Sequence, residues 1–319
     1  MMRGTLPAIL TALATAALVA GCNSSSSPVP PSFIPFSTIY VANNTAVTSY
    51  PLSGTGNILP STNITGGSTT FNHPWGISVD AAGNIFVADE NANAVDKFAA
   101  GANGNVAPIG RITGLSTSLN NPLGVWVDGA GKIYVANELE PGVLVFAAGA
   151  NGNVAPIQNI TGAATQIVDP TGIVVDAAGN IFVGDCTSGV LEFSAGANGN
   201  ATPAAHIAGA STMLSCPEQI ALDASGKLYV AERNNNKVLV FAAGANGNAT
   251  PAAQITNATT AFGSVAGIAV DQSGKIYVSD FTRASVIVFA AGANGSTVPI
   301  QTISGGNTAL SGNEYLALH

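Results

Sequence analysis

A unit of 47 or 48 residues, repeated five times, constrains this chain more than any other feature of its sequence. Each unit contains an Asp-x-x-Gly turn and ends in a segment such as AAGANGN. The marker aspartates are Asp80, Asp128, Asp176, Asp223 and Asp271. A fixed period in this range is typical of repeat architectures, in which each unit is one supersecondary element. We therefore expect one fold built from similar units.

Within each unit the pattern predicts short β-strands. In the second unit the runs are residues 124–128, 133–137, 142–146 and 154–162. The Asn-Gly dipeptide of AGANGN predicts a tight hairpin between the third and fourth runs. Pro156 indicates that the fourth run is an edge strand, because proline cannot donate to a ladder on both sides. Four strands in about 45 residues are typical of a propeller blade.

The two ends of the chain predict one further blade. Residues 314–318 can supply an innermost strand, while residues 38–67 match the second, third and fourth strands of a unit. Pairing them would close the ring and remove free sheet edges. The sequence thus predicts an all-β, six-bladed β-propeller with four-stranded blades, one of them completed by both termini.

The inner half of each unit resembles the NHL repeat. The pattern P-x-G-I-x-V-D-x-x-G-x-I-Y-V-A-D is matched closely by residues 74–89, 122–137 and 170–185. The fourth unit departs from it with Gln219 in place of Gly, and the fifth with Val265 in place of Pro. In such propellers the loops and the central funnel carry function. We define the funnel face as the face where the inner strands begin and the second strands end.

The N-terminus is predicted to be a targeting segment. Arg3 precedes a short apolar stretch that ends in Leu18-Val19-Ala20-Gly21-Cys22, which resembles the lipobox of bacterial lipoproteins. The resemblance implies a signal peptide over residues 1–21, a lipid on Cys22 and a Ser/Pro-rich tether over 22–36, before a propeller over 37–319. The protein would then sit in the bacterial cell envelope, at the outer membrane, in the periplasm or on the surface. The alternative is an ordinary signal peptide with a nearby cysteine.

Composition excludes one class of partner. The chain carries nine Lys and Arg residues and a net charge of −8. It therefore lacks the basic stripe that neutralises nucleic-acid phosphates. We expect a monomer that contacts the membrane only through its lipid.

Six oxygen-bearing residues end the predicted second strands: Asn43, Asp89, Asn137, Asp185, Glu232 and Asp280. Such a ring could hold calcium, which prefers six to eight oxygen ligands. Gluconolactonase-like propellers use a Glu, an Asn and an Asp around one divalent ion, and the resemblance points to Glu232, Asn137 and Asp185. The favoured interpretation is structural, with each residue capping a turn of its own blade. No other cofactor is predicted.

Residues that break the repeat are the better candidates for binding. His73 precedes an inner strand, whereas Glu90, Glu138, Arg233 and Arg283 lie in or beside the loops after the second strands. We expect these five residues on the funnel face.

Two cysteines remain besides Cys22. Cys186 follows a second strand and Cys216 precedes the next inner strand, so both belong on the funnel face. Export permits a disulfide between them.

Two classes of function stay open at this point. The first is a binding propeller that recognises a protein, peptide or glycan through its funnel loops. The second is a metal-dependent hydrolase or lyase resembling gluconolactonases. The sparse histidines and in-register acids favour the first class.

Overall fold

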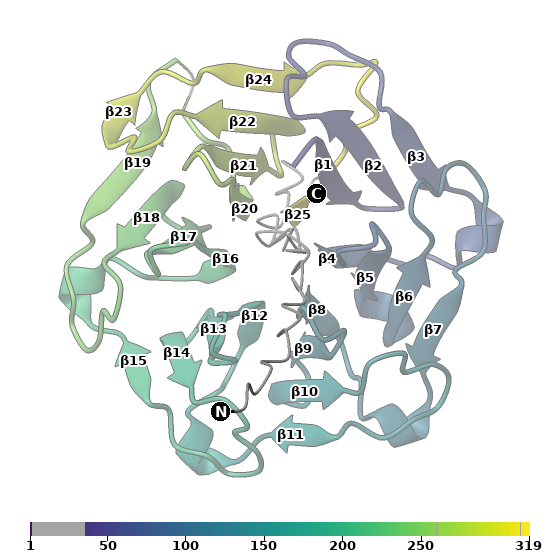
Figure 1. The fold of residues 1–319 in the computed structure, drawn as a ribbon. Helices are drawn as coiled ribbons and strands as arrows, with labels where there is room; N and C mark the ends of the chain where they lie inside the picture. Colours follow the sequence, from purple (N-terminus) through teal and green to yellow (C-terminus); the bar gives the residue numbers. More distant parts are fainter. Residues whose placement is uncertain (2–35, 260, 313) are drawn as a thin grey trace. The chain divides into compact units, whose positions relative to one another are not determined.

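The computed structural model describes residue 1 and residues 36–259, 261–312 and 314–319, and the part from residue 36 onward forms a ring of six sheets (Figure 1). The predicted signal peptide, Cys22 and most of the tether lie outside these residues, so they stay predictions. Among the described residues, no helix has the length and apolar character needed to cross a bilayer.

Five blades follow the repeat, each from an inner to an outer strand (Figure 1). Blade 1 comprises β4 (Pro74–Val79), β5 (Ile85–Asp89), β6 (Ala94–Phe98) and β7 (Gly110–Thr113). Blade 2 comprises β8 (Pro122–Val127), β9 (Ile133–Asn137), β10 (Gly142–Phe146) and β11 (Gln158–Ile160). Blade 3 comprises β12 (Pro170–Val175), β13 (Ile181–Asp185), β14 (Gly189–Phe193) and β15 (Ala205–Ile207). Blade 4 comprises β16 (Pro217–Leu222), β17 (Leu228–Glu232), β18 (Lys237–Phe241) and β19 (Ala253–Asn257). Blade 5 comprises β20 (Val265–Val270), β21 (Ile276–Asp280), β22 (Ser285–Phe289) and β24 (Gln301–Ser304).

Blade 6 joins the two ends of the described domain, as the sequence predicts. Its strands are β25 (Leu316–Leu318), β1 (Thr38–Asn43), β2 (Ala46–Pro51) and β3 (Thr62–Thr65). β25 pairs antiparallel with β1, placing Leu318 opposite Ile39. The carbonyl of His319 also accepts the backbone N–H groups of Ser37 (2.7 Å) and Thr38 (2.8 Å). The prediction of a blade shared by both termini is confirmed.

The marker aspartates stabilise the turns between inner and second strands, on the face opposite the funnel face. Oδ1 of Asp80 accepts the backbone N–H groups of Ala82 (3.0 Å) and Asn84 (2.9 Å), and the other four units repeat this arrangement. These aspartates recur because the turn needs them.

The AGANGN segments do not form the tight hairpins that the sequence predicted. Each lies in a longer loop that reaches the outer strand of the preceding blade. In blade 1, Asn103 accepts the N–H of Asn63 (2.8 Å) and Asn105 accepts that of Ser68 (2.7 Å). The predicted outer strands are correspondingly shorter, and Pro156 precedes β11 instead of lying in it. The repeated asparagines therefore join neighbouring blades.

One unit departs from this arrangement. Its segment has Ser296 where the other four units have the second asparagine. There β23 (Gly295–Thr297) pairs in parallel with β19 and adds a fifth strand to the sheet of blade 4.

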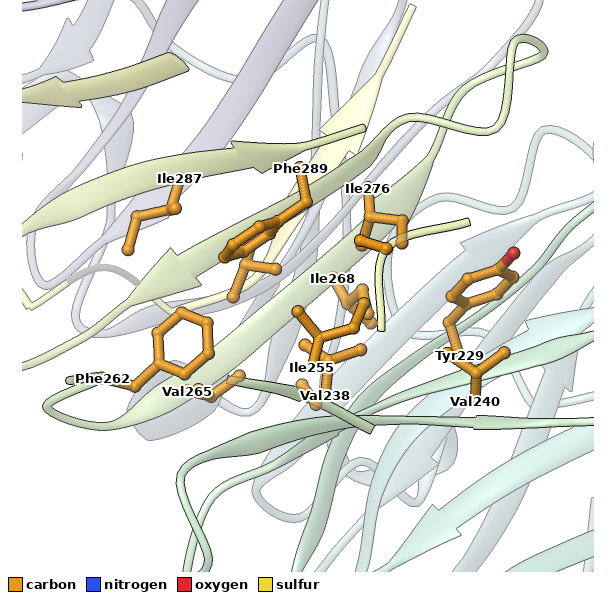
Figure 2. Packing of buried hydrophobic residues seen from close by; sticks show 13 residues of the cluster. Tyr229, Val238, Val240, Ile255, Phe262, Val265, Ile268, Ile276, Ile287 and Phe289 are labelled. Atoms are coloured by element: carbon orange, nitrogen blue, oxygen red, sulfur yellow. The ribbon is translucent and has the colours of Figure 1, made fainter. Parts of the chain in front are cut away.

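The core lies between the blades. Figure 2 shows one cluster, in which Tyr229 and Val238 of blade 4 and Phe289 of blade 5 are among the members. A phenylalanine ends the third strand of each of the first five blades and is completely buried: Phe98, Phe146, Phe193, Phe241 and Phe289. Burial of such faces is the main term that stabilises the ring.

Candidate functional site

Six buried side chains at the ends of the second strands hold each blade together, and we call them the clamp ring. They are Asn43, Asp89, Asn137, Asp185, Glu232 and Asp280, each at most 1% exposed. The Asp89 carboxylate accepts the backbone N–H groups of Asn72 (3.0 Å) and His73 (2.7 Å). Glu232 accepts those of Ser215 (3.0 Å) and Cys216 (2.8 Å). These bonds fasten the segment before each inner strand to the end of the second strand.

The predicted cation ligands Asn137, Asp185 and Glu232 all belong to this ring. Oδ1 of Asn137 accepts the N–H of Asn120 at 2.8 Å. The Asp185 oxygens accept backbone N–H groups from the segment before β12 and from the loop after β13. These bonds account for the burial of all three side chains, because each oxygen satisfies a backbone N–H of its own blade. This is the structural role that the sequence favours for them. Across residues 36–259, 261–312 and 314–319, no group of three His, Cys, Asp or Glu side chains is placed to hold a metal.

Residues that differ between units surround the clamp ring on the funnel face. We call the residues that follow the clamp residues the rim ring: Glu90, Glu138, Cys186, Arg233, Phe281 and Asn44. We call the second residues of the inner strands, or their equivalent before β25, the inner ring: Trp75, Leu123, Thr171, Glu218, Ala266 and Glu314. The two rings together form what we call the funnel mouth.

Three of the predicted binding residues are joined by hydrogen bonds on blades 1 and 2. His73 Nδ1 pairs with Glu90 Oε2, and Asn121 Nδ2 donates to Glu90 Oε1 (3.1 Å) and to Glu138. Burial opposes ionisation of Glu90, but the bonds from His73 and Asn121 outweigh it and lower the pKa of Glu90. Burial raises the pKa of Glu138, and the nearby charge of Asp169 adds to this. This side of the mouth is an acidic, hydrogen-bonded row.

Arg233 occupies the opposite side of the mouth. Its guanidinium donates to Glu218 Oε1 at 2.9 Å and lies 5.8 Å from the ring centre of Trp75 and 5.3 Å from that of Phe281. The other oxygen of Glu218 accepts the hydroxyl of Tyr315 at 3.0 Å. Burial raises the pKa of Glu218 although Arg233 opposes this. A planar cation is thus held between two aromatic rings and a carboxylate, an arrangement that suits guanidinium.

Glu314 lies beside this pair without a partner. Its side chain is completely buried, and neither carboxyl oxygen has a hydrogen-bond partner among the described residues. The indole Nε1 of Trp75, at the same position in the next blade, is also buried, and its nearby polar group is the hydroxyl of Tyr315. Burial raises the pKa of Glu314 to about 8; Glu218 and Glu90 add to the rise and Arg233 opposes it. Unsatisfied buried polar groups in a native fold call for an explanation.

Gln219 links the inner strands of blades 4, 5 and 6 beneath the funnel mouth. Its Nε2 donates to the carbonyl of Leu316 (2.8 Å), and its Oε1 accepts the N–H groups of Leu316 (3.0 Å) and Ile268 (2.8 Å). A Cβ on Gly267 would lie 3.0 Å from Gln219 Oε1 and 2.4 Å from Ser279 Oγ, so this glycine leaves room for the side chain of Gln219. Beyond Gln219, a cavity of about 200 Å³ is lined mainly by aliphatic side chains of the inner strands.

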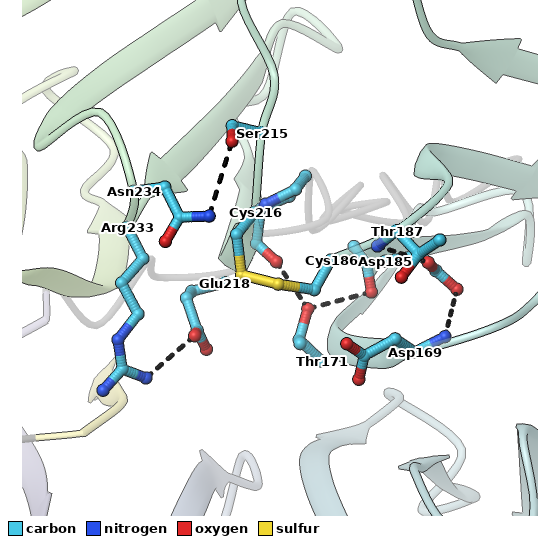
Figure 3. Close-up of a disulfide and its surroundings, with 12 residues drawn as sticks. Asp169, Thr171, Asp185, Cys186, Thr187, Ser215, Cys216, Glu218, Arg233 and Asn234 are labelled. Atoms are coloured by element: carbon cyan, nitrogen blue, oxygen red, sulfur yellow. Dashed lines mark hydrogen bonds and ion pairs between the residues drawn. A yellow bond between two sulfur atoms is a disulfide. The ribbon is translucent and has the colours of Figure 1, made fainter.

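Cys186 and Cys216 are joined by a disulfide that links blades 3 and 4 at the funnel face (Figure 3). The hydroxyl of Thr171 donates to the carbonyl of Pro217 at 2.6 Å, immediately beside the bridge. Glu218 follows Pro217 in the chain, so the bridge lies at the strand that carries the partner of Arg233 (Figure 3).

All five predicted binding residues lie on the funnel face of the structure. Further residues that were not predicted lie there as well. Arg283 is 42% exposed and lies 3.8 Å from Asp280, outside the central cluster. Sequence reasoning missed Trp75, Glu218, Glu314 and Tyr315. Aligning the second inner-strand residue of every unit would have singled out the first three, because one tryptophan and two glutamates there interrupt otherwise small or apolar residues.

Comparisons with known proteins agree with this fold. The family model of the NHL repeat matches residues 71–98 and 214–241. Each match runs from the segment before an inner strand to the end of the third strand, in blades 1 and 4. No curated protein sequence matches the chain.

Several solved structures have the same architecture. A chain from a nidogen/laminin complex has a TM-score of 0.62 and 14% identity, covering 89% of this chain and 98% of that chain. A protein of unknown function from Bacteroides caccae has a TM-score of 0.65 and 10% identity, again over 89% and 98%. A putative 6-phosphogluconolactonase from Bacteroides uniformis has a TM-score of 0.57 and 17% identity, over 85% and 83%. At these identities the likeness concerns the fold alone.

Proposed function

We propose that this chain, a six-bladed β-propeller built from NHL repeats, is a binding module that uses its funnel mouth. We further propose that a lipid on Cys22 anchors it in the bacterial cell envelope. One observation carries the first proposal. Side chains that break the repeat converge on one face, and Glu314 there has two buried carboxyl oxygens without partners in the described chain.

The acidic residues have two kinds of role, and this difference supports a binding function for the funnel mouth. Marker aspartates hold turns and clamp residues hold strand ends, so both sets are explained by the blades. Glu218 and Glu314 have no such repeated role, since the equivalent residues in the other blades are Trp75, Leu123, Thr171 and Ala266. Residues that are costly to bury and serve no blade are candidates for binding.

A metal-dependent lactonase or lyase receives less support. The likeness to a putative lactonase is a likeness of fold. The candidate ligands Asn137, Asp185 and Glu232 are hydrogen-bonded to backbone groups. Replacing Glu232 by Gln would therefore weaken blade 4 whether or not the protein is a catalyst, which makes this substitution a poor test of catalysis.

The proposal can be tested with ligand selection. A phage-displayed random peptide library and a glycan array are screened against the immobilised propeller, and each hit is tested against Trp75→Ala. Lys132→Ala, on the turn side of blade 2, is the matched control. We expect hits whose binding is lost in Trp75→Ala and kept in Lys132→Ala. If no hit depends on Trp75, the funnel mouth is not a binding site and the proposal fails.

A further inference from the structure

We propose that the funnel mouth binds the guanidinium group of an arginine side chain from a peptide partner, with Glu314 as its carboxylate anchor and Trp75 as its stacking surface. We infer in addition that Arg233 occupies this site in the unbound protein. Both statements rest on the proposed binding function and name its ligand.

The charge balance of the mouth favours a cation. Among the twelve residues of the rim and inner rings, four are acidic and one is basic: Glu90, Glu138, Glu218 and Glu314 against Arg233. Asp169, just before β12, adds another acid beside Glu138. Carboxylates gathered in a funnel raise the local concentration of positively charged ligands.

The contacts of Arg233 indicate which kind of cation fits the funnel mouth. Its flat group lies near the ring centres of Trp75 and Phe281, at 5.8 and 5.3 Å, while Glu218 accepts its N–H at 2.9 Å. This is a guanidinium site filled by the protein's own side chain. A compact ammonium group would not match the planar rings equally well.

The side chain of Glu314 has no partner in the described chain when Arg233 and Glu218 form their ion pair. Its neighbour in the chain, Tyr315, donates its backbone N–H to the carbonyl of Trp75 (3.3 Å) and its hydroxyl to Glu218 (3.0 Å). The charges of Arg233, Glu218 and Glu90 also act on the carboxyl group of Glu314. Both of its oxygens are free of partners in the described chain. An incoming guanidinium would release the proton that Glu314 keeps in the unbound protein up to about pH 8, and the two carboxylate oxygens would then match its paired N–H groups. The mouth thus holds two central carboxylates, Glu218 and Glu314, for one arginine.

The burial of Glu314 requires something to move before a ligand can reach it. Arg233 is suited to this because its side chain is 27% exposed and is carried by the turn between β17 and β18. An incoming arginine would displace Arg233 from Trp75 and pair with Glu314. Removing Arg233 should therefore strengthen binding, whereas removing the charge of Glu314 should weaken it.

Trp75 offers a direct readout. The chain has two tryptophans, and the other, Trp126, lines the cavity on the far side of Gln219. In a Trp126→Phe background, Trp75 fluorescence is titrated with N-acetyl-arginine amide, with its neutral isostere N-acetyl-citrulline amide, and with N-acetyl-lysine amide. We expect saturable binding of the arginine probe, weaker binding of the lysine probe and no response to the citrulline probe.

Variants in the same background then identify the anchor. We expect Glu314→Gln to weaken binding of the arginine probe by about tenfold or more and Arg233→Gln to strengthen it. Glu140→Gln, elsewhere on the funnel face, and Lys132→Gln, on the turn side of blade 2, change the same charges away from the mouth and should alter binding little. Circular dichroism and thermal melts establish that each variant is folded.

Two results would overturn the inference. One is an equal response of Trp75 to the arginine and citrulline probes in folded Trp126→Phe protein. The other is undiminished binding in folded Glu314→Gln. If selected peptides depend on Trp75 yet contain no arginine, the guanidinium assignment fails while the binding function stands.

Discussion

At the scale of single residues, the same chemical group serves opposite purposes in this chain. A carboxylate such as Asp89 lies next to backbone N–H groups and stabilises its blade. The carboxyl of Glu314 is equally buried but has no partner in the described chain. The extent of burial alone therefore does not distinguish structural from functional acids. The presence or absence of hydrogen-bond partners distinguishes them.

Glu314 should make the stability of the protein fall as pH rises. Burial raises its pKa from the ordinary 4.5 to about 8, so between these values the folded state keeps a proton that the unfolded chain releases. Its unfavourable contribution grows from about pH 4.5 to pH 8 and is absent in Glu314→Gln. We expect thermal melts to show that this variant gains stability relative to wild type between pH 5 and pH 8.

Asp96, a buried acid outside the funnel mouth, does not obscure this comparison. Burial also raises the pKa of Asp96 to about 7, which adds the same trend to both proteins and cancels in their difference. Melting curves of wild type and Glu314→Gln that run parallel across this pH range would show that Glu314 titrates normally.

At the scale of elements, the sequence predicted the strands well and their connections poorly. Alternation and turn residues located three strands of each blade, because both patterns reflect local geometry. The AGANGN segment was misjudged because its asparagines bond to the preceding blade, about 40 residues earlier in the chain, as Asn103 does to Asn63. Tyr315 was missed for a related reason: it meets Glu218, 97 residues away, only once the ring has closed.

The joint between blades can be tested at one asparagine. Asn105→Ala removes the acceptor for the N–H of Ser68 and should lower the free energy of unfolding by about 1 kcal/mol. Asn91→Ala, at an exposed asparagine in the loop after β5, is the control and should be near neutral. Urea denaturation measures both, and equal effects would refute a role of AGANGN in joining blades.

The disulfide between blades 3 and 4 allows a second test at this scale. In protein prepared without reductant and with Cys22→Ser, alkylation and mass spectrometry should find neither Cys186 nor Cys216 labelled. Because the bridge closes a loop of 30 residues, replacing both cysteines by serine should cost about 3 kcal/mol of stability. Two labelled thiols in the folded, unreduced protein would contradict the bridge.

At the scale of the whole molecule, stability depends on closing the ring. β25 supplies the inner strand of blade 6 and places Leu316 in the core shared with Val41 and Tyr277. Without it, blade 6 would lose its inner strand, the inner strands of blades 5 and 1 would each lose a neighbour, and the ring would have an open edge.

Removing residues 312–319 should therefore open the propeller and not merely shorten it. We expect a large fall in melting temperature together with loss of cooperativity, measured by calorimetry. Removal of residues 1–35 is the control and should leave the transition in place. An unchanged midpoint after the C-terminal truncation would refute closure by both termini.

The position of Phe36 has a consequence for how the molecule faces its surroundings. Phe36 lines the channel cavity together with Val79, Leu222 and Leu318, which end their inner strands on the face opposite the funnel mouth. The described domain therefore begins on its turn side, away from the funnel mouth. A label or surface attachment introduced at Phe36 would leave the mouth open to ligands in solution.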